Sequence, residues 1–418
     1  MGSLARIRGR LEQARGLMRR VRALPLRIEP ELAVLREVRA VADLTAQTPP
    51  SPGVVVQLET AQHISEEVML TRLAGRTAGH DMPPWHAGHG GAPMAGVMVS
   101  RVVQAIHLPE YGAVITQDGR VLRSSVAEAL YLTPSLAALP GVAMVDGAPQ
   151  LTVRRGMPVI DRGAVFMAWG GRFNYGHFLI DCMAALAALE RCGLTERFTV
   201  IAPALNDWQR ETLRLFLGER RAARVREITA PAVHIDDAVF ASAMDHFLHA
   251  PNRPLDVVRT RMLAAIDEPP TGVSRLYVNR LSDTKRPLVN ELELEAALVA
   301  RGFVSVAPET LSLTRQIALF RDADVIVGPT GAALANVLFC KPGAQVFELQ
   351  PTNFIGIWAR GLSHFVEASW HGFFAPSPLS ETDIHIEGVP KPGVSFHWRI
   401  ETPEVLAWID QGLEHDPA

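Results

Sequence analysis

Residues 275–350 of the chain are RLYVNRLSDTKRPLVNELELEAALVARGFVSVAPETLSLTRQIALFRDADVIVGPTGAALANVLFCKPGAQVFELQ. Short runs rich in β-branched and apolar residues, RLYVNR, FVSVA, DVIVG and AQVFELQ, predict strands. The stretches between them, NELELEAALVARG, ETLSLTRQIALFRDA and AALANVLF, predict helices, the first ended by Gly302. Strands that alternate with helices of this length predict βαβ units and a parallel, doubly wound sheet.

The loop after DVIVG is the first candidate for ligand binding, because ligands of open parallel sheets bind beyond the carboxyl ends of the strands. It contains Pro329, Thr330, Gly331, Ala332 and Ala333 and opens a helix. Small residues allow close approach of an anion, and a helix N-terminus offers free N–H groups. The loop is neither a Walker loop nor a GxGxxG motif. We expect it to hold a diphosphate; a turn for tight helix–sheet packing is the alternative.

Charged residues follow two other strands at the same expected edge. Arg280, Lys285 and Arg286 come after RLYVNR, and guanidinium groups match phosphate oxygens in bidentate geometry. Glu348 near the end of AQVFELQ is placed to accept hydrogen bonds from ribose hydroxyls. The alternatives are a solvated basic loop for the first group and a capping or salt-bridged carboxylate for Glu348.

Asp322 and Asp324 have the Asp-x-Asp spacing that metal-dependent glycosyltransferases use to bind a divalent cation. Here the pair lies where a helix ends and a buried strand begins, which is the wrong end of the strand for ligands. We therefore interpret both as structural carboxylates and predict no metal and no other cofactor.

The first half of the chain predicts strands at 97–108, 111–122, 163–170 and 198–203, with a hairpin turn at Asp118-Gly119. Helices are expected at about 176–192 and at 207–218, the second with Asp207 as N-cap and Gly218 as its end. This half should be α/β with some antiparallel strands.

His177 and Asp181 are spaced i, i+4 at the start of the first of these helices, so they share a face. A carboxylate beside an imidazole orients it and raises its basicity. Either residue is a candidate general base, with His177 preferred. The alternative is a hydrogen-bond network at the start of the helix, with Asn174 as its cap.

The N-terminal segment predicts a basic amphipathic helix over residues 4–24, with an apolar stripe from Leu4 to Val21 and seven arginines on its polar positions. Such a helix can lie on an anionic membrane surface. It can equally pack on its own domain or on a second copy of the chain in a homo-oligomer.

Residues 51–96 are expected to be a linker and irregular region. His80, Asp81, His86 and His89 within it have no standard metal-ligand spacing, so we favour a loop over a metal site. A break at 267–272 separates two larger units. The predicted division is therefore a helical extension at 1–50, the irregular region at 51–96, domains at 97–266 and 273–400, and a C-terminal helix at 401–418.

The composition narrows the class of protein. Of the 418 residues, 48% are hydrophobic and 20% charged, which provides for packed cores and excludes a disordered chain. The net charge of −3 argues against a nucleic-acid-binding protein. Three cysteines form no disulfide framework or zinc spacing, and no apolar run reaches 18 residues. We expect a cytoplasmic protein, with peripheral contact to the inner face of a membrane left open for residues 1–24.

Several segments together resemble glycosyltransferase family 61. NYGHFLID (174–181) is similar to the motif of the family's N-terminal domain. Residues 280–351 are similar to its C-terminal half through Arg280, Arg286, Asn290, Glu291, Gly302-Phe303, residues 308–339, Pro342-Gly343 and FELQP. Thr330 departs from the pattern, since many members have His before the glycine.

The resemblance implies a GT-B fold: two Rossmann-like domains that face a cleft, here with the extra N-terminal helix. It implies an inverting, metal-independent transferase that moves a sugar from a nucleotide donor, expected to be a UDP-sugar, to a glycan or polysaccharide hydroxyl, as in capsular polysaccharide biosynthesis. Catalysis would fall to His177 and Asp181, with Asn174 and Tyr175 structural or on the acceptor side. The expected donor-binding residues are Arg280, Arg286, Asn290, Thr330, Gly331, Ala332, Asn336 and Glu348.

Two other functions remain open from the sequence. A non-catalytic nucleotide- or glycan-binding protein with the same fold is favoured by Thr330 and would show no turnover of a nucleotide sugar. A Rossmann oxidoreductase is disfavoured by the missing GxGxxG motif and would bind NAD(P).

Overall fold

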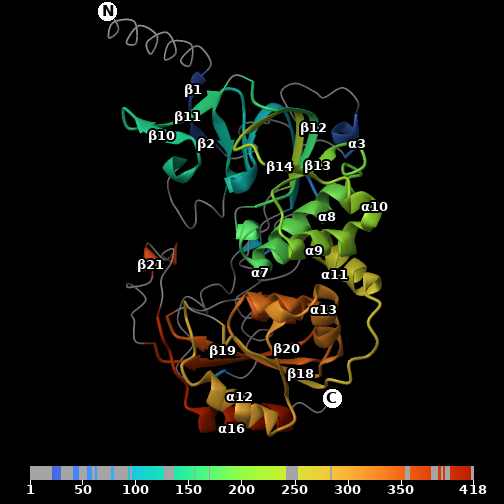
Figure 1. Cartoon of the computed structure of the whole chain (residues 1–418), viewed down its shortest axis with the longest axis vertical. Helices are drawn as coiled ribbons and strands as arrows, with labels where there is room; N and C mark the ends of the chain where they lie inside the picture. The colour runs from blue at the N-terminus through green and yellow to red at the C-terminus, as the bar shows by residue number, and fades with distance from the viewer. Residues whose placement is uncertain are drawn as a thin grey trace, which may run out of the picture.

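The computed structural model describes residues 21–29, 41–46, 54–58, 62–63, 77–79, 93–94, 97–126, 136–154, 156–168, 170–241, 253–282, 285–353, 358–377, 385–386, 389–390 and 396–415. These residues form two parts, each built around a sheet (Figure 1). Helix α11 (Arg253–Ala265) leads from the first part to the second. Among the described residues, no helix is long and apolar enough to cross a bilayer.

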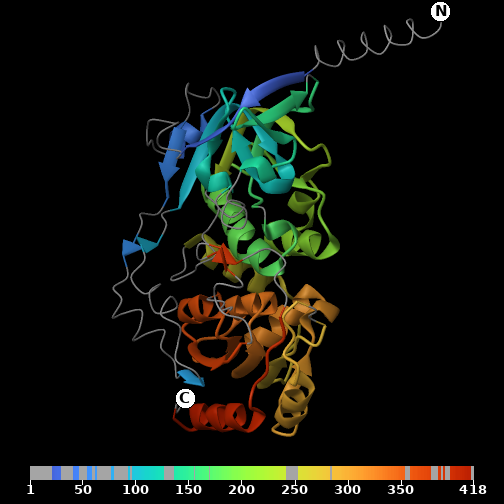
Figure 2. The ribbon, with the colours of Figure 1, turned by 90° about the vertical axis from the view of Figure 1, so that its left-hand side faces the viewer.

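The second part contains a fully parallel six-stranded sheet in the order β17-β16-β18-β19-β20-β5. This confirms the parallel sheet that the alternating pattern predicts. Its strands are β17 (Val304–Val306), β16 (Arg275–Val278), β18 (Val325–Pro329), β19 (Gln345–Pro351), β20 (Ser369–Ala375) and β5 (Thr77–Gly79). The edge strand β5 comes from the region expected to be irregular, so that expectation is wrong for residues 77–79; Figure 2 shows it as a short blue arrow in the orange and red part.

Helices cover both faces of this sheet because successive strand residues point to opposite sides. Val327 packs toward α12 (Glu291–Val299) and α16 (Thr402–His415). Ile326 packs toward the other layer, which Figure 1 shows above the sheet. That layer comprises α13 (Leu313–Asp322), the 3₁₀ helix η6 (Ala332–Phe339) and α14 (Trp358–Phe365); the 3₁₀ turn η5 (Pro308–Thr310) precedes α13.

The first part contains a mixed sheet in the order β14-β13-β12-β15-β7-β8-β9-β2, with β3 also paired to β7. The four strands β14, β13, β12 and β15 are parallel, and β7 is antiparallel to β15. The predicted hairpin is present, since Gly119 turns with φ 85° between β8 and β9. The bounds are β14 (Arg226–Ile228), β13 (Thr199–Pro203), β12 (Val159–Val165), β15 (Val233–Ala241), β7 (Met98–Leu108), β8 (Ala113–Ile115), β9 (Arg120–Leu122), β2 (Arg27–Glu29) and β3 (Val54–Gln57).

The N-terminal segment differs from the prediction where the structure describes it. Residues 21–25 form β1 (Val21–Pro25), which pairs with β11 (Ala148–Arg154) rather than continuing a helix. Pro25 would break a helix, and the buried Leu24 packs with Leu151. Residues 4–20 of the predicted helix, and His80, Asp81, His86 and His89, lie outside the described residues. Strand β3 also lies in the region 51–96 that was expected to be a linker, and it pairs with β7 in the mixed sheet.

The short elements of the described chain complete the list. They are β10 (Val142–Val145), beside β11, the pair β4 (Gln62–His63) and β6 (Pro93–Met94), the pair β21 (His385–Ile386) and β22 (Val389–Pro390), α3 (Val41–Thr45), and the 3₁₀ turns η1 (Pro109–Tyr111), η2 (Leu136–Ala138) and η3 (Gly170–Arg172).

The helix predicted at 176–192 is present with a change of geometry in its middle. It consists of α7 (Tyr175–His177), the π-helical turn η4 (Phe178–Cys182) and α8 (Met183–Arg191). Helices α9 (Asp207–Leu217) and α10 (Glu219–Ala222) follow. Asn206, not Asp207, caps α9, because its side chain and that of Gln209 form a reciprocal capping box. Gly218 ends α9 as predicted.

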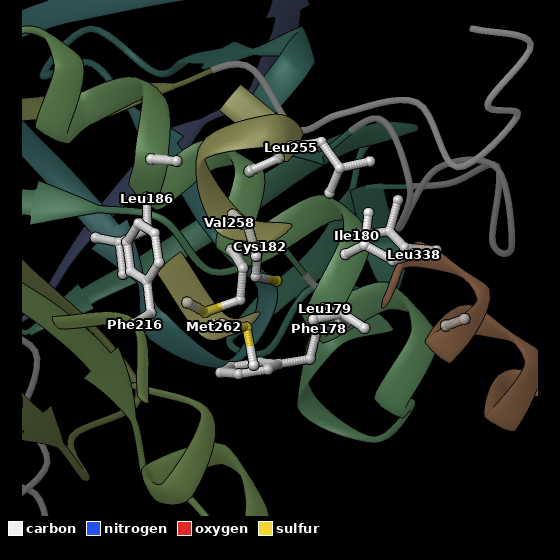
Figure 3. Packing of buried hydrophobic residues seen from close by; sticks show 14 of the residues in the cluster. Phe178, Leu179, Ile180, Cys182, Leu186, Phe216, Leu255, Val258, Met262 and Leu338 are labelled. Atoms are coloured by element: carbon white, nitrogen blue, oxygen red, sulfur yellow. The ribbon is translucent and has the colours of Figure 1, made fainter. Parts of the chain in front are cut away.

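One apolar core runs through both parts. Figure 3 shows Cys182 and Leu186 packed with Val258 and Met262 of α11, and Leu338 of η6 close to Ile180. Arg259 of α11 donates from Nε to the carbonyl oxygen of Leu338 at 2.9 Å and from Nη2 to that of Cys340 at 2.9 Å. Helix α11 therefore joins the two parts by apolar packing and by satisfying carbonyl groups at the end of η6.

A buried ion pair fixes the mixed sheet. The Arg101 side chain is fully buried on β7, and its Nε and Nη2 donate to the two carboxylate oxygens of Asp237 on β15 at 2.8 and 2.7 Å. Its Nη1 also donates to the carbonyl oxygens of Leu44 and Ala46 at 3.0 and 2.9 Å. One guanidinium thus ties α3 to two strands.

Arg101→Met should lower the free energy of unfolding by about 3–5 kcal/mol, because it leaves the Asp237 carboxylate buried without its main partner. Denaturant titration followed by circular dichroism measures this loss. Arg27→Met is the matched control, since Arg27 pairs on the surface, and should leave the midpoint nearly unchanged. Equal midpoints for both variants would contradict a stabilising role for Arg101.

Candidate functional site

The start of α7 is set by Asn174. Its side chain accepts hydrogen bonds from the backbone N–H groups of Gly176 at 2.8 Å and His177 at 3.3 Å. These groups have no partner within a helix, so an Asn in this position begins the helix at Tyr175. The cap that the alternative interpretation assigned to Asn174 is present, and it fixes the backbone that carries His177.

His177 and Asp181 form a close pair. His177 Nδ1 lies 2.8 Å from Asp181 Oδ2, so the i, i+4 spacing does place both on one face. The Asp181 side chain is 1% exposed and that of His177 is 13% exposed. A hydrogen bond from Nδ1 to the carboxylate makes Nε2 the basic nitrogen. Asp181 is thus placed to orient the imidazole, which leaves His177 as the proton acceptor of the two.

Residues from both parts of the chain meet beside this pair. The Tyr175 hydroxyl donates to Asn336 Oδ1 on η6 at 2.5 Å, and Asn336 Nδ2 donates to Gln316 on α13 at 3.0 Å. Asn336 is fully buried, and burial raises the pKa of Tyr175 well above its ordinary value. Asn336 has a structural role at this junction, and a donor contact for it stays a prediction.

Trp358 of α14 closes the junction on the other side. Its ring meets that of His177 edge to face, with centroids 4.8 Å apart. A Cβ on Gly176 would lie 2.1 Å from Trp358 Cζ3, so only glycine fits between Tyr175 and His177. Sequence reasoning did not find Trp358, because no spacing or motif relates it to residues 175–177.

The glycine loop lies at the carboxyl end of β18, as predicted. Gly331 is extended with φ 172°, and Gly331, Ala332 and Ala333 are partly exposed where η6 begins. Thr330 N–H donates to the Leu349 carbonyl oxygen at 2.8 Å, which pins the loop to β19. The loop therefore presents helix-start amides at the sheet edge where ligands of such folds bind.

Arg280 lies directly over this loop. Its guanidinium donates to the Thr330 carbonyl oxygen, and a Cβ on Gly331 would lie 2.8 Å from Arg280 Nε. The absence of a side chain at Gly331 is what lets the guanidinium approach. The structure thus brings together the arginine and the glycine loop that the sequence placed on one edge.

A buried carboxylate fixes the backbone of Arg280. Glu291 accepts from the Arg280 N–H at 2.5 Å and from the Tyr277 hydroxyl at 3.1 Å. Glu291 is 2% exposed, and burial raises its pKa. Tyr277, Arg280 and Glu291 are therefore linked by hydrogen bonds that position Arg280. The sequence indicated Arg280 as a donor-binding residue and Glu291 only as a match to the family, and it did not indicate Tyr277.

Arg286 and Asn290 are tied to the C-terminal segment. The Arg286 carbonyl oxygen accepts from Trp398 Nε1 at 3.0 Å. Asn290 Nδ2 donates to the Ile400 carbonyl oxygen at 3.0 Å, and its Oδ1 accepts from the Ile400 N–H at 3.3 Å. These contacts give Asn290 a structural role, and donor binding by either residue stays a prediction.

Glu348 is enclosed in the protein. It is 1% exposed and accepts from Trp370 Nε1 at 2.9 Å, with the buried Arg360 nearby. Burial raises the pKa of Glu348 to about 7, and burial lowers the pKa of Arg360 to about 10. These contacts give Glu348 a structural role, and a contact with a donor ribose stays a prediction.

Asp322 and Asp324 lie at the start of β18, opposite the glycine loop. Asp322 pairs with Arg321 at 2.7 Å, and the hydrogen bond from Arg321 lowers its pKa to about 2. Asp324 accepts from Ser274 at 2.6 Å and pairs with Lys341. Both carboxylates are thus paired with side chains of the protein, and the absence of a metal stays a prediction. No cluster of three His, Cys, Asp or Glu side chains suited to a metal ion occurs in the described part of the chain.

Glu348 gives a pH-dependent contribution to stability. Its folded pKa lies above the ordinary value near 4.5, so the folded state binds more protons and stability falls as pH rises from about 4.5 through 7. Glu348→Gln should remove this loss, on the order of 3 kcal/mol between about pH 5 and pH 8.

Denaturant titrations at the two pH values measure the difference. Glu404→Gln, at an exposed glutamate, is the control and should keep the wild-type pH dependence. A Glu348→Gln variant that loses stability with pH as steeply as the wild type would show that Glu348 ionises normally.

A known protein family matches the region that contains these residues. Residues 175–347 match the family model described as Glycosyltransferase 61. The matched segment begins at Tyr175 of α7 and ends in β19, so it contains the His177–Asp181 pair, Arg280 and the glycine loop. No curated protein matches the chain.

Proposed function

We propose that this chain, which carries a glycosyltransferase family 61 domain and is therefore a glycosyltransferase, transfers a sugar from a nucleoside diphosphate donor, UDP being the expected nucleotide, to a hydroxyl group of a glycan. We further propose inversion at the anomeric carbon, no need for a divalent metal, and a GT-B arrangement of the two parts. The observation that carries the proposal is the packing of α7, with His177, against η6, whose first residues form the glycine loop.

The chemistry divides between the two parts. His177 Nε2 takes the proton of the acceptor hydroxyl while the acceptor oxygen bonds to the anomeric carbon. The bond from that carbon to the diphosphate oxygen breaks on the opposite face, which inverts the configuration. Asp181 holds the imidazole and balances the charge that it gains.

The leaving diphosphate gains negative charge as this bond breaks. In this proposal the Arg280 guanidinium and the amides of residues 331–333 stabilise it, which is supported by the close approach of Arg280 to Gly331. Glu291 and Tyr277 contribute indirectly, because they hold the backbone of Arg280. This division assigns acceptor activation to the first part and donor binding to the second.

His177→Ala and Asp181→Asn should each lower kcat, the first by roughly 10²–10⁴-fold, as expected for a positioned base. Nucleotide binding should persist, because the donor contacts lie in the other part. Release of UDP measures turnover, and calorimetry measures binding. His234→Ala is the matched control, since His234 on β15 also lies near an aspartate, Asp236, at 3.2 Å.

Unchanged turnover in His177→Ala would remove this residue from the mechanism. Loss of both turnover and binding would show that the variant is misfolded, and wild-type binding of nucleotide without any turnover would favour the non-catalytic binding protein.

Arg280→Ala should weaken UDP binding by roughly 10–150-fold, the value of one charge-assisted hydrogen bond. Arg321→Ala, at the opposite end of β18, should leave the affinity unchanged. Titration by calorimetry in EDTA measures both and tests the metal-free prediction in the same experiment. Loss of wild-type binding in EDTA, or equal losses in the two variants, would contradict the proposed donor site.

A further inference from the structure

An arginine-lined cavity lies in the first part of the chain, away from the residues discussed so far. It has a volume of about 420 Å³ and is bounded by the turn before β13 and by α9 and α10. Four arginines, Arg197, Arg220, Arg221 and Arg224, line it, against the single acid Glu196. Its apolar wall consists of Phe198, Val200 and Leu217.

The four arginines differ in the ion pairs and hydrogen bonds that their side chains form. Arg221 pairs with Glu190 and donates to Thr195 Oγ1 at 2.9 Å, and Arg197 donates to the Thr45 carbonyl oxygen. Arg220 and Arg224 are exposed, and within the described residues neither forms an ion pair or a side-chain hydrogen bond. The cavity therefore retains uncompensated positive charge.

The local sequence concentrates this charge at a cost. Gly218 turns the chain with φ 78°, and α10 begins at the next residue. Arg220 and Arg221 therefore lie in α10, and Arg224 follows shortly after its end. Arg220 lies in α10 and Arg224 lies two residues beyond its end, and two positive charges this close in the chain repel each other. An anion bound between them would relieve the repulsion.

We propose that this cavity binds the oxyanion, carboxylate or phosphate, of an acidic sugar unit in the acceptor glycan. Guanidinium groups pair with both oxyanions in bidentate geometry, and a cavity of this size accommodates a small ligand. The assignment to an acceptor rests on the proposed function, whereas the anion site itself rests on the cavity and its charges.

The cavity lies at the opposite edge of the mixed sheet from His177. Thr199 and Val200 are the first residues of β13, whereas Asn174 and α7 follow the carboxyl end of the parallel strand β12. Figure 1 shows α10 on the outer side of the first part and α7 at the junction. An anion in the cavity therefore does not compete with the donor, and a glycan that occupies both places must be an oligomer.

The test measures binding to the full chain of three probes: an oligogalacturonate hexamer, the neutral maltohexaose and inorganic phosphate. Calorimetry with the Arg220→Gln/Arg224→Gln double variant should show at least a 10-fold loss of affinity for the acidic hexamer. Arg214→Gln, at an exposed arginine of α9 outside the cavity, is the control and should lose little.

The proposal would be overturned if the wild type did not bind the acidic hexamer, or if it bound maltohexaose equally tightly. Equal losses of affinity in the control and double variants would also overturn it. Phosphate bound as tightly as the acidic hexamer would contradict it as well, because that result indicates a site for small anions only. UDP binding is followed in parallel and should be the same in all variants. Its absence from the wild type would count against the proposed function and not against the anion site.

Discussion

The hydrogen bond between Tyr175 and Asn336 is the contact on which the arrangement of the site depends. It joins α7 of the first part to η6 of the second. Asn336 is fully buried and Tyr175 is half-buried, so breaking the bond would leave the buried Asn336 carbonyl group without this partner. Because His177 lies two residues after Tyr175 and Gly331 immediately precedes η6, this one contact sets the position of the imidazole relative to the glycine loop. Gly176 and Trp358 make the same junction close-packed.

The second constraint is the direction of the strands. In a parallel sheet all carboxyl ends lie at one edge, so Arg280 after β16 and Gly331 after β18 come together without any contact encoded between them in the sequence. The Glu291 carboxylate then fixes Arg280 by accepting a hydrogen bond from its backbone N–H. At the C-terminal end of η6, Arg259 of α11 donates to the carbonyl oxygen of Leu338. Contacts at both ends of η6 therefore hold the sheet edge that carries the glycine loop.

The sequence predicted what depends on local spacing. Alternation of strands and helices gave the parallel sheet, the cap residue Asn174 gave the start of α7, and the i, i+4 spacing gave the His177–Asp181 pair. Contacts between distant segments were not predictable in this way. Strand β5 joins a sheet formed nearly 200 residues later, and nothing in residues 77–79 indicates its partner.

The burial and hydrogen-bond partners of polar side chains were also not predictable from the sequence. Asn336 and Glu348 are polar residues in the expected region, and only the structure shows that both are enclosed and hydrogen-bonded within the protein. Residues 21–24 were predicted as the end of a helix from their apolar spacing, yet pairing with β11 prevailed because it buries Leu24 in a sheet. Tertiary pairing of this kind overrides a helical pattern over a few residues.

A crystal structure of the chain with UDP bound tests most directly whether the second part binds the donor. The diphosphate should lie against the backbone amides of residues 331–333 and the Arg280 guanidinium, with its outer phosphate directed toward the His177 imidazole. A diphosphate bound elsewhere, for example among the arginines of the cavity beside α10, would contradict the assignment of donor binding to the second part.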